Sequence, residues 1–178
     1  NNLTGYAKYL STEAVYCNDR KAPNYAVNNS FVYYVYTRLY TMKKPTYDCE
    51  DNRDAFSRSN PDAKLTYPVG LMTADEITYA GGYRYNNNAS AWYYLNSLGG
   101  SITGSTFWWL ISPQYRDFNS KYLFAYNIGG LGYAGILDNG SRNINYSFGV
   151  RPVISIKGDT LYFSGNGSPE SPYEIVYN

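Results

Sequence analysis

The side chains that could do chemistry in this chain are tyrosines, asparagines and scattered carboxylates, because its 178 residues include no histidine. Histidine is the side chain that most often moves protons near neutral pH and most often binds transition metals. Its absence excludes Ser-His-Asp catalysis, Cys-His catalysis and histidine-zinc sites. The carboxylates, the two cysteines and the aromatic residues are left as the groups that could carry a function.

Carboxylates in pairs can hydrolyse a glycosidic bond, one acting as the acid and the other as the base or nucleophile. The most acidic stretch of the chain runs from Asp48 to Arg58 and includes Glu50, Asp51 and Asp54. Its charged and turn-forming residues predict a solvated loop rather than a catalytic pair. No spacing of acids resembles that of an EF-hand, so we expect neither a metal site nor a cofactor.

Two further acidic motifs have structural interpretations. Asn60-Pro61-Asp62 has some similarity to the Pro-centred tripeptide of calcium-dependent lectins, but a simple turn is favoured. Asp75 and Glu76 follow Thr73, which places a capping residue at the start of a helix, a glutamate three residues later and acidic charge in the first turn. The sequence therefore predicts a helix that begins at Thr73 and ends at Gly81-Gly82.

Tyrosine and small polar residues dominate the composition, with 23 Tyr, 19 Asn, 16 Ser and 16 Gly. Tyr provides contact area at a low cost in side-chain entropy, while Asn, Ser and Gly provide adaptable hydrogen bonding, a mixture typical of binding surfaces. The same mixture would also suit an extracellular β-rich fold that uses Tyr in strands and Asn in turns. Composition alone leaves both interpretations open.

Charge and hydropathy limit the partners. The net charge of +1 gives no long-range field to attract phosphate groups, so nucleic acid is not an expected partner. No stretch approaches the roughly 20 consecutive apolar residues of a membrane span, so we expect no membrane insertion by this segment. The length fits a single domain, residues 1–178, with its own core.

Cys17 and Cys49 are the only thiols and lack the close spacing of a zinc or redox motif. In an extracellular protein they should form one disulfide, which would stabilise the N-terminal region by about 3 to 4 kcal/mol in the chain-entropy model. The alternative is two separate buried thiols.

Runs of strand-forming residues separated by Gly, Asn and Pro are frequent, and segments with helical periodicity are few. Besides the helix at Thr73, weaker patterns predict helices at Tyr9–Val15 and Ala91–Asn96. The pattern predicts an α+β fold with antiparallel sheets, one or two short helices and much irregular loop. The predicted strands are Phe31–Tyr40, Leu65–Met72, Thr106–Ile111, Lys121–Ile128, Leu131–Leu137, Asn143–Ser147, Val150–Ile156, Thr160–Phe163 and Tyr173–Val176.

Asn139-Gly140 lies between two of these strands and is a strong signal for a two-residue hairpin. The implied register sets Leu137 opposite Arg142 and Ile136 opposite Asn143, with Ile136 and Asn143 on an exposed face. Elsewhere, the apolar runs at Phe107-Trp108-Trp109-Leu110 and Val150–Ile154 predict buried core strands.

Several motifs, read together, resemble those of a known family. The chain is similar to bacterial domains of C-type-lectin-like fold, in the formylglycine-generating-enzyme-like branch, many of which are variable proteins of diversity-generating retroelements. The resemblance spans nearly the whole chain. It rests on Tyr16–Arg20, Arg38-Leu39, Lys44-Pro45, Cys49, Tyr67–Glu76, Ala80-Gly81-Gly82, Trp108–Pro113, Gly149–Ile156, Gly165–Ser168 and Pro172-Tyr173.

The resemblance implies a C-type-lectin-like fold with a variable region at about residues 114–148, rewritten by error-prone reverse transcription at adenines. Adenine mutation of Asn codons can give Tyr, Ser, Asp, Gly, Ile and Arg, but never Trp, Met, Gln or Glu. None of those last four occurs from Tyr115 to Phe148. The oxidising enzyme of this branch uses a C-terminal cysteine pair. No cysteine follows Cys49, so we expect no such activity.

The function implied is non-enzymatic binding of an unknown protein or glycan on another cell or host. The domain would be an adhesin or pilus-associated protein, extracellular on a bacterial surface or pilus, or on a phage particle. Tyr would anchor the ligand, Arg and Asp would set charge complementarity and Asn would adjust hydrogen bonding. The predicted contact residues are Tyr115, Arg116, Asp117, Asn119, Tyr122, Tyr126, Tyr133, Ile136, Asp138, Asn139, Arg142, Asn143, Asn145 and Tyr146.

Two alternative functions remain open at this point. One is a carbohydrate-binding or carbohydrate-active module that uses acids and stacked aromatic rings. The other is a structural surface or pilus subunit whose Tyr and Asn residues face neighbouring copies. Two carboxylates converging in a cleft would favour the first, and an interface between copies over Tyr122–Tyr146 would favour the second.

Overall fold

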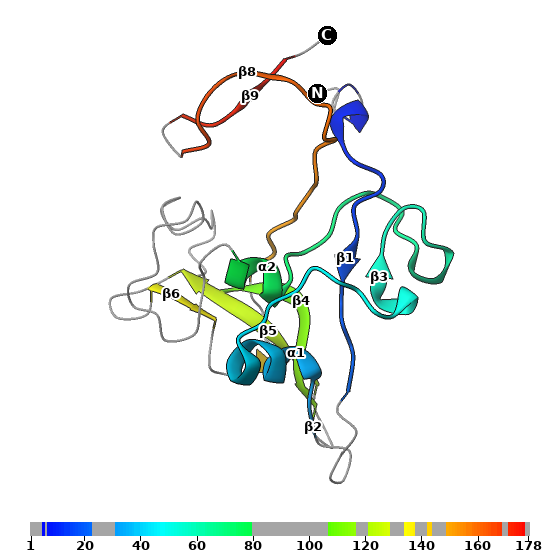
Figure 1. The fold of residues 1–178 in the computed structure, drawn as a ribbon, viewed down its shortest axis with the longest axis vertical. Coiled ribbons are helices and arrows are strands. Elements are labelled where there is room, and N and C mark those ends of the chain that lie inside the picture. The colour runs from blue at the N-terminus through cyan, green and yellow to red at the C-terminus, as the bar shows by residue number, and fades with distance from the viewer. Residues whose placement is uncertain are drawn as a thin grey trace.

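The computed structural model describes residues 5, 7–22, 31–79, 107–116, 121–128, 134–137, 142–143, 149–168 and 171–176. These segments form short helices, small antiparallel sheets and long connecting loops (Figure 1), so the expected α+β class is confirmed. Within them, no helix has the length and apolar character that crossing a membrane requires. The helix predicted at Ala91–Asn96 and the helix end predicted at Gly81-Gly82 lie outside the described residues.

The largest sheet is antiparallel and has β4 between β2 and β5. Both β6 and β7 pair with the other edge of β5. The strands predicted around Phe107 and from Lys121 are confirmed, and the first continues to Arg116. The five strands are β2 (Phe31–Val32), β4 (Phe107–Arg116), β5 (Lys121–Ile128), β6 (Ala134–Leu137) and β7 (Arg142–Asn143).

Asn139-Gly140 lies outside the described residues, but the strand pairing predicted across it, Leu137 with Arg142, is wrong. β6 pairs antiparallel with β5 at Leu137, and β7 pairs antiparallel with the same strand at Arg142. Two strands that are both antiparallel to β5 run in the same direction, so β6 and β7 follow one another along one edge and cannot form a hairpin. The turn preference of an Asn-Gly pair is local and carries no information about which strand its neighbours pair with.

The strand predicted at Phe31–Tyr40 is limited to β2. The chain then forms α1 (Tyr34–Thr37), which continues as a π-helical turn at Arg38–Met42. Val35 and Leu39 are four residues apart, and both are completely buried. That spacing places them on the same side of a helix, and their burial outweighs the strand preference of Val and Tyr.

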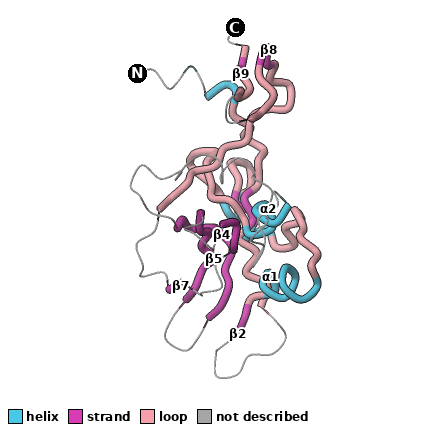
Figure 2. The backbone as a smooth tube through the Cα atoms, turned by 90° about the vertical axis from the view of Figure 1, so that its left-hand side faces the viewer, coloured by secondary structure: helices cyan, strands magenta, loops and turns pink. Residues whose placement is uncertain are grey.

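The core lies between the helices and β4. Leu110 of β4 is completely buried against Val35, Leu39, Ala74 and Ile77, which confirms the prediction of a buried strand at this residue. Figure 2 shows α1 and α2 on one side of β4 and β5. One face of the main sheet is therefore closed by helices.

The second helix, α2 (Ala74–Tyr79), begins with the predicted capping box. The Thr73 hydroxyl accepts a hydrogen bond from the Glu76 backbone N–H at 3.0 Å, and Glu76 Oε2 accepts one from the Thr73 N–H at 2.7 Å. Two backbone donors that the helix itself cannot satisfy are paired in this way.

The N-terminal half contains a small sheet in which β1 (Tyr16–Cys17) pairs with β3 (Ala55–Phe56). The disulfide between Cys17 and Cys49 is confirmed. The helix predicted at Tyr9–Val15 is wrong, because Leu10 forms a bridge with Ile156 and its neighbour Ser11 donates to the Ser155 carbonyl. Turns of 3-10 helix lie at Ala7–Tyr9, Asn52–Asp54 and Pro61–Ala63, the last confirming the turn predicted at Asn60-Pro61-Asp62.

The strand predicted at Val150–Ile156, with a buried core part at Val150–Ile154, is wrong. Val150 is 64% exposed and Ile154 is 49% exposed, and the segment makes isolated bridges at Val153 and Ile156 instead of a strand. Val153 bridges to Gly70. Gly70 is the one residue of the segment Leu65–Met72 that forms a bridge, so the strand predicted there is also wrong.

The chain then forms a hairpin of β8 (Tyr162–Ser164) and β9 (Glu174–Ile175), close to the strands predicted at Thr160–Phe163 and Tyr173–Val176.

Replacing Thr73 by Ala should lower the free energy of unfolding by about 1 kcal/mol, because the capping hydroxyl is lost. Urea denaturation followed by circular dichroism measures the change. Thr66→Ala is the matched control at an exposed loop position and should leave the free energy of unfolding unchanged. Equal effects of the two substitutions would contradict the capping role.

Candidate ligand-binding surface and its frame

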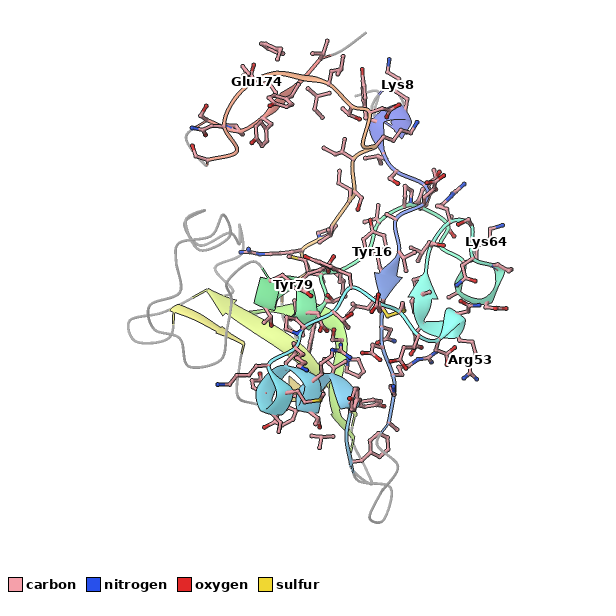
Figure 3. The ribbon with its side chains drawn as sticks, in the orientation of Figure 1. Lys8, Tyr16, Arg53, Lys64, Tyr79 and Glu174 are labelled. Atoms are coloured by element: carbon pink, nitrogen blue, oxygen red, sulfur yellow. A yellow bond between two sulfur atoms is a disulfide. The ribbon has the colours of Figure 1, made fainter. Side chains whose placement is uncertain are left out.

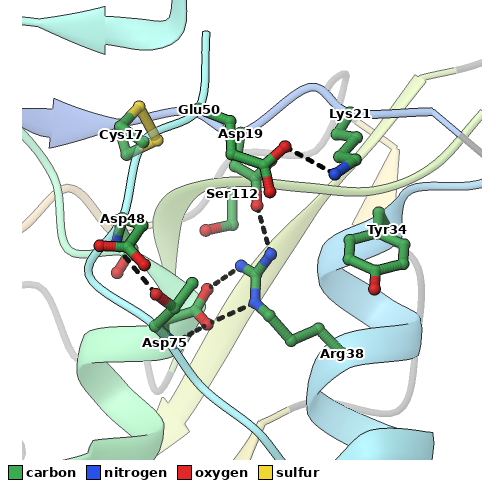
Figure 4. Close-up of polar contacts among 12 residues, drawn as sticks. Cys17, Asp19, Lys21, Tyr34, Arg38, Asp48, Glu50, Asp75 and Ser112 are labelled. Atoms are coloured by element: carbon green, nitrogen blue, oxygen red, sulfur yellow. Dashed lines mark hydrogen bonds and ion pairs between the residues drawn. A yellow bond between two sulfur atoms is a disulfide. The ribbon is translucent and has the colours of Figure 1, made fainter.

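A buried arginine connects the two helices to the N-terminal loop. Arg38 is 9% exposed, and its guanidinium donates to both carboxylate oxygens of Asp75, from Nε at 2.9 Å and from Nη2 at 2.6 Å. Its third nitrogen, Nη1, donates to Asp19 Oδ2 at 2.6 Å (Figure 4). The paired, planar arrangement with Asp75 is the geometry in which arginine binds a carboxylate most strongly.

The same carboxylate also holds a third segment. Asp75 Oδ1 accepts a hydrogen bond from the Thr46 N–H at 3.0 Å, and next to it the Ala74 N–H donates to the Ser112 hydroxyl of β4 at 2.9 Å. Burial acts to lower the pKa of Arg38, but hydrogen bonds to Asp75 and Asp19 outweigh it and raise that pKa. The guanidinium therefore stays charged.

The loop that carries Asp19 is also fixed beside α1. Lys21 Nζ donates to Glu50 at 2.6 Å, and the Tyr34 N–H donates to the Lys21 carbonyl at 2.8 Å. The Cys17–Cys49 disulfide joins the same two loops a few residues away. The disulfide and the ion pairs thus hold the loops at residues 17–21 and 46–50 against the two helices, behind β4. We call these linked segments the frame.

An open, charged hollow of about 760 Å³ lies on the outside of the frame. Arg20, one of the residues that line it, donates to the Asp54 carboxylate from its backbone N–H and from its side-chain Nε. Arg53 pairs with Asp51 at 2.7 Å, and hydrogen bonds from Arg53 lower the pKa of Asp51 to about 2. The described residues that line the hollow are all charged or polar: Asp19, Arg20, Lys21, Glu50, Asp51, Asn52, Arg53, Asp54 and Asp62.

The prediction that these acids form a solvated loop is therefore only partly correct. Glu50 is exposed, whereas Asp54 is 3% exposed and anchors Arg20. A buried carboxylate requires a partner, and the folded chain supplies one from a loop 34 residues away. Among the described residues, no group of three or more acids or cysteines is arranged to hold a metal ion.

Seven of the predicted contact residues lie on described strands. The other seven, at positions 117, 119, 133, 138, 139, 145 and 146, lie outside the described residues. The seven on strands are Tyr115 and Arg116 in β4, Tyr122 and Tyr126 in β5, Ile136 in β6, and Arg142 and Asn143 in β7.

Strand register brings three of these positions together. Tyr115 is opposite Tyr122, and Tyr122 is opposite Asn143, so the three form one row across β4, β5 and β7. Paired positions in adjacent strands are about 5 Å apart. Tyr126 is further along β5, where it is opposite Trp108 and Leu137, and so does not belong to this row.

Gln114, at the start of the predicted variable region, is a buried residue of β4. Gln114 is 2% exposed, and its carbonyl accepts a hydrogen bond from the Tyr33 N–H, so it belongs to the core side of β4 with Leu110 and Ser112. Its neighbour Tyr115 is the first residue of β4 that is also a predicted contact residue.

The Arg38 network itself was not found by sequence reasoning. Asp75 is interpreted there as a capping residue, and Arg38 and Asp19 serve only as parts of the family resemblance. A charged residue inside an apolar run, as Arg38 is, was the signal available, because such a residue needs a buried counter-charge. Its partners are 19 and 37 residues away and carry no local signal.

Comparison with known protein families, curated proteins and solved structures finds no match.

Replacing Arg38 by Met should lower the free energy of unfolding by about 3 to 5 kcal/mol, because Asp75 and Asp19 would lose their buried counter-charge. The measurement is chemical denaturation at neutral pH. Arg53→Met is the matched control, since its ion pair with Asp51 is solvent-exposed and should leave the midpoint unchanged. Similar midpoints for the two variants would show that the Arg38 network does not support the frame.

Proposed function

We propose that this chain is a non-enzymatic ligand-binding domain of C-type-lectin-like fold, a variable protein diversified by a retroelement and displayed outside a bacterial cell. The observation that carries the proposal is the row formed by Tyr115, Tyr122 and Asn143 across three strands, next to a core side that is closed by helices. Within the predicted variable region, these positions are contiguous in space although they are up to 28 residues apart in sequence.

The frame supports this role because a binding surface loses less entropy when its support is already rigid. The disulfide between Cys17 and Cys49 and the ion pairs of Arg38 join three chain segments behind β4. Substitutions in the row need not disturb those contacts, because none of the links involves a residue after Ser112. Residues that vary and residues that hold the fold together would thus lie in different parts of the chain.

The row's composition favours a protein or glycan ligand. Tyrosine rings combine apolar area with a hydroxyl, and asparagine offers both a donor and an acceptor. Arg116 of β4 is opposite Lys121 of β5, next to the row. The residues beside the row therefore include two with a positive charge. Binding energy should concentrate in a few central tyrosines.

The genetic arm of the proposal is tested by sequencing the gene and its surroundings in a natural population. We expect a neighbouring reverse transcriptase gene and a template repeat that differs from this gene only at adenines. Substitutions should fall within codons 115–148, and codons 31–79 serve as the internal control. A locus without such a repeat, or with substitutions spread evenly over both segments, would refute diversification by a retroelement.

The structural arm is tested by substitution. Tyr115→Ser, Tyr122→Asp and Asn143→Tyr should each change the free energy of unfolding by no more than about 0.5 kcal/mol, as expected at surface positions. Gln114→Ser is the adjacent control and should be clearly destabilising, because it alters a buried side chain. Losses at the row that equal or exceed the loss at Gln114 would show that the row is part of the core.

A further inference from the structure

The C-terminal hairpin β8–β9 projects from the rest of the molecule (Figures 1 and 2). At its base, the Lys157 N–H donates to the Tyr9 carbonyl at 2.9 Å. β2 lies at the other end of the molecule. The hairpin is therefore remote from the row that begins at Tyr115, which is opposite Val32 of β2.

The turn of this hairpin contains the tripeptide Asn166-Gly167-Ser168. Asn-x-Ser and Asn-x-Thr are the sequences at which oligosaccharides are attached to exposed loops of secreted proteins. Of the asparagines that begin such tripeptides, only Asn166 lies in the described residues, and it is exposed. The six tripeptides begin at Asn2, Asn28, Asn88, Asn139, Asn145 and Asn166.

The Asn166 side chain is oriented by one of its two polar atoms. Its Oδ1 accepts a hydrogen bond from the Ser168 N–H at 2.9 Å, which closes an Asx turn within the tripeptide. Among the described residues, no group accepts a hydrogen bond from Asn166 Nδ2. The hydrogen bond at Oδ1 polarises the carboxamide and makes the Nδ2 protons easier to remove. The nitrogen that would receive a sugar is thus unoccupied and at the surface.

The backbone that presents Asn166 has a defined conformation. Gly165 has φ +93°, and a Cβ there would be 2.0 Å from the Pro172 carbonyl oxygen, so only glycine fits. The N–H groups of residues 166 and 167 both donate to the Ser171 carbonyl, at 2.9 and 3.1 Å. Just before the turn, the Ser164 hydroxyl donates to Glu174, labelled in Figure 3, at 2.8 Å. The acceptor asparagine is therefore held on a preformed turn.

An exposed aromatic ring lies beside the tripeptide. A Cβ at Gly167 would be 2.8 Å from Cε2 of Tyr173, which places that ring against the middle residue. Tyr173 is 57% exposed. The C–H groups of a sugar ring are attracted to the negative face of an aromatic ring. A sugar on Asn166 would therefore find apolar contact area next to its point of attachment.

We propose that Asn166 is an N-glycosylation site, which receives an oligosaccharide carried on a lipid diphosphate. In the transfer, Asn166 Nδ2 forms a bond to the anomeric carbon of the first sugar, and the bond from that carbon to the diphosphate oxygen breaks. The lipid diphosphate leaves with the electron pair of that bond. One proton of Nδ2 goes to a base of the transferase, and no group is oxidised or reduced.

This modification goes beyond the ligand-binding role and shares with it only the export of the chain. The Cys17–Cys49 disulfide fits that condition, because disulfides persist in oxidising compartments outside the cytosol. The sugar would be at the end opposite β2, so it would leave the row of Tyr115, Tyr122 and Asn143 uncovered.

Mass spectrometry of the protein purified from the cells that naturally produce it tests the proposal. After proteolysis, we expect the peptide that contains Asn166 to carry the additional mass of an oligosaccharide. An amidase that cleaves the bond between asparagine and sugar should remove this mass and leave an aspartate at the same position. An unmodified Asn166 would overturn the proposal, and so would sugars found only at other asparagines.

Three variants made in the same cells show whether the tripeptide directs the attachment. Asn166→Gln removes the acceptor and Ser168→Ala removes the hydroxyl that the motif requires, so each should abolish the sugar at this site. Ser168→Thr is the matched control and should retain it, because threonine also satisfies the motif. Circular dichroism confirms that the variants fold. Sugar that persists on Asn166 after Ser168→Ala, or disappears after Ser168→Thr, would contradict attachment through this motif.

Discussion

The pairing of Arg38 with the carboxylates of Asp19 and Asp75 is the interaction on which the described fold depends. Removing three charges from water is costly, and the cost is recovered only when every charge meets a partner with good geometry. The three side chains come from a loop, from the helical turn after α1 and from the first turn of α2. Once they meet, the relative positions of those segments are fixed within hydrogen-bond tolerance.

The network also determines how β4 is used. Helices α1 and α2 are held over one face of the strand, where Leu110, Ser112 and Gln114 are buried. The next residue, Tyr115, begins the row that crosses to β5 and β7. One strand therefore belongs to the rigid core over most of its length and to the proposed ligand-binding surface at its end. Under the proposed function, this arrangement would let side chains in the row change while the core contacts stay the same.

Among the described residues, some hydrophobic side chains are buried and others remain exposed. Five of them form the small core between α1, α2 and β4. Others, in residues 150–173, remain on the surface of the C-terminal segment. Because the hydrophobic effect favours removing such groups from water, the packed core, rather than the C-terminal segment, contributes this stabilisation to the described fold.

Local features were predictable from the sequence because their causes are local. The capping box at Thr73 and the strand from Lys121 depend on residues within a few positions, and both are observed. The disulfide was also predictable, because Cys17 had only one possible partner within the chain. At this level the sequence alone established the α+β class and the start of β4.

The tertiary structure decided the features that depend on distant partners. The Tyr34–Met42 segment is helical because Val35 and Leu39 are both buried in the core, despite strand-forming residues. The strands on either side of Asn139-Gly140 do not pair with each other, because both pair with β5. Asp75 is more than a helix cap because Arg38 arrives from 37 residues away. Burial energy and charge pairing act between segments that only the folded chain brings together, so they overrule local preference without leaving a local signal.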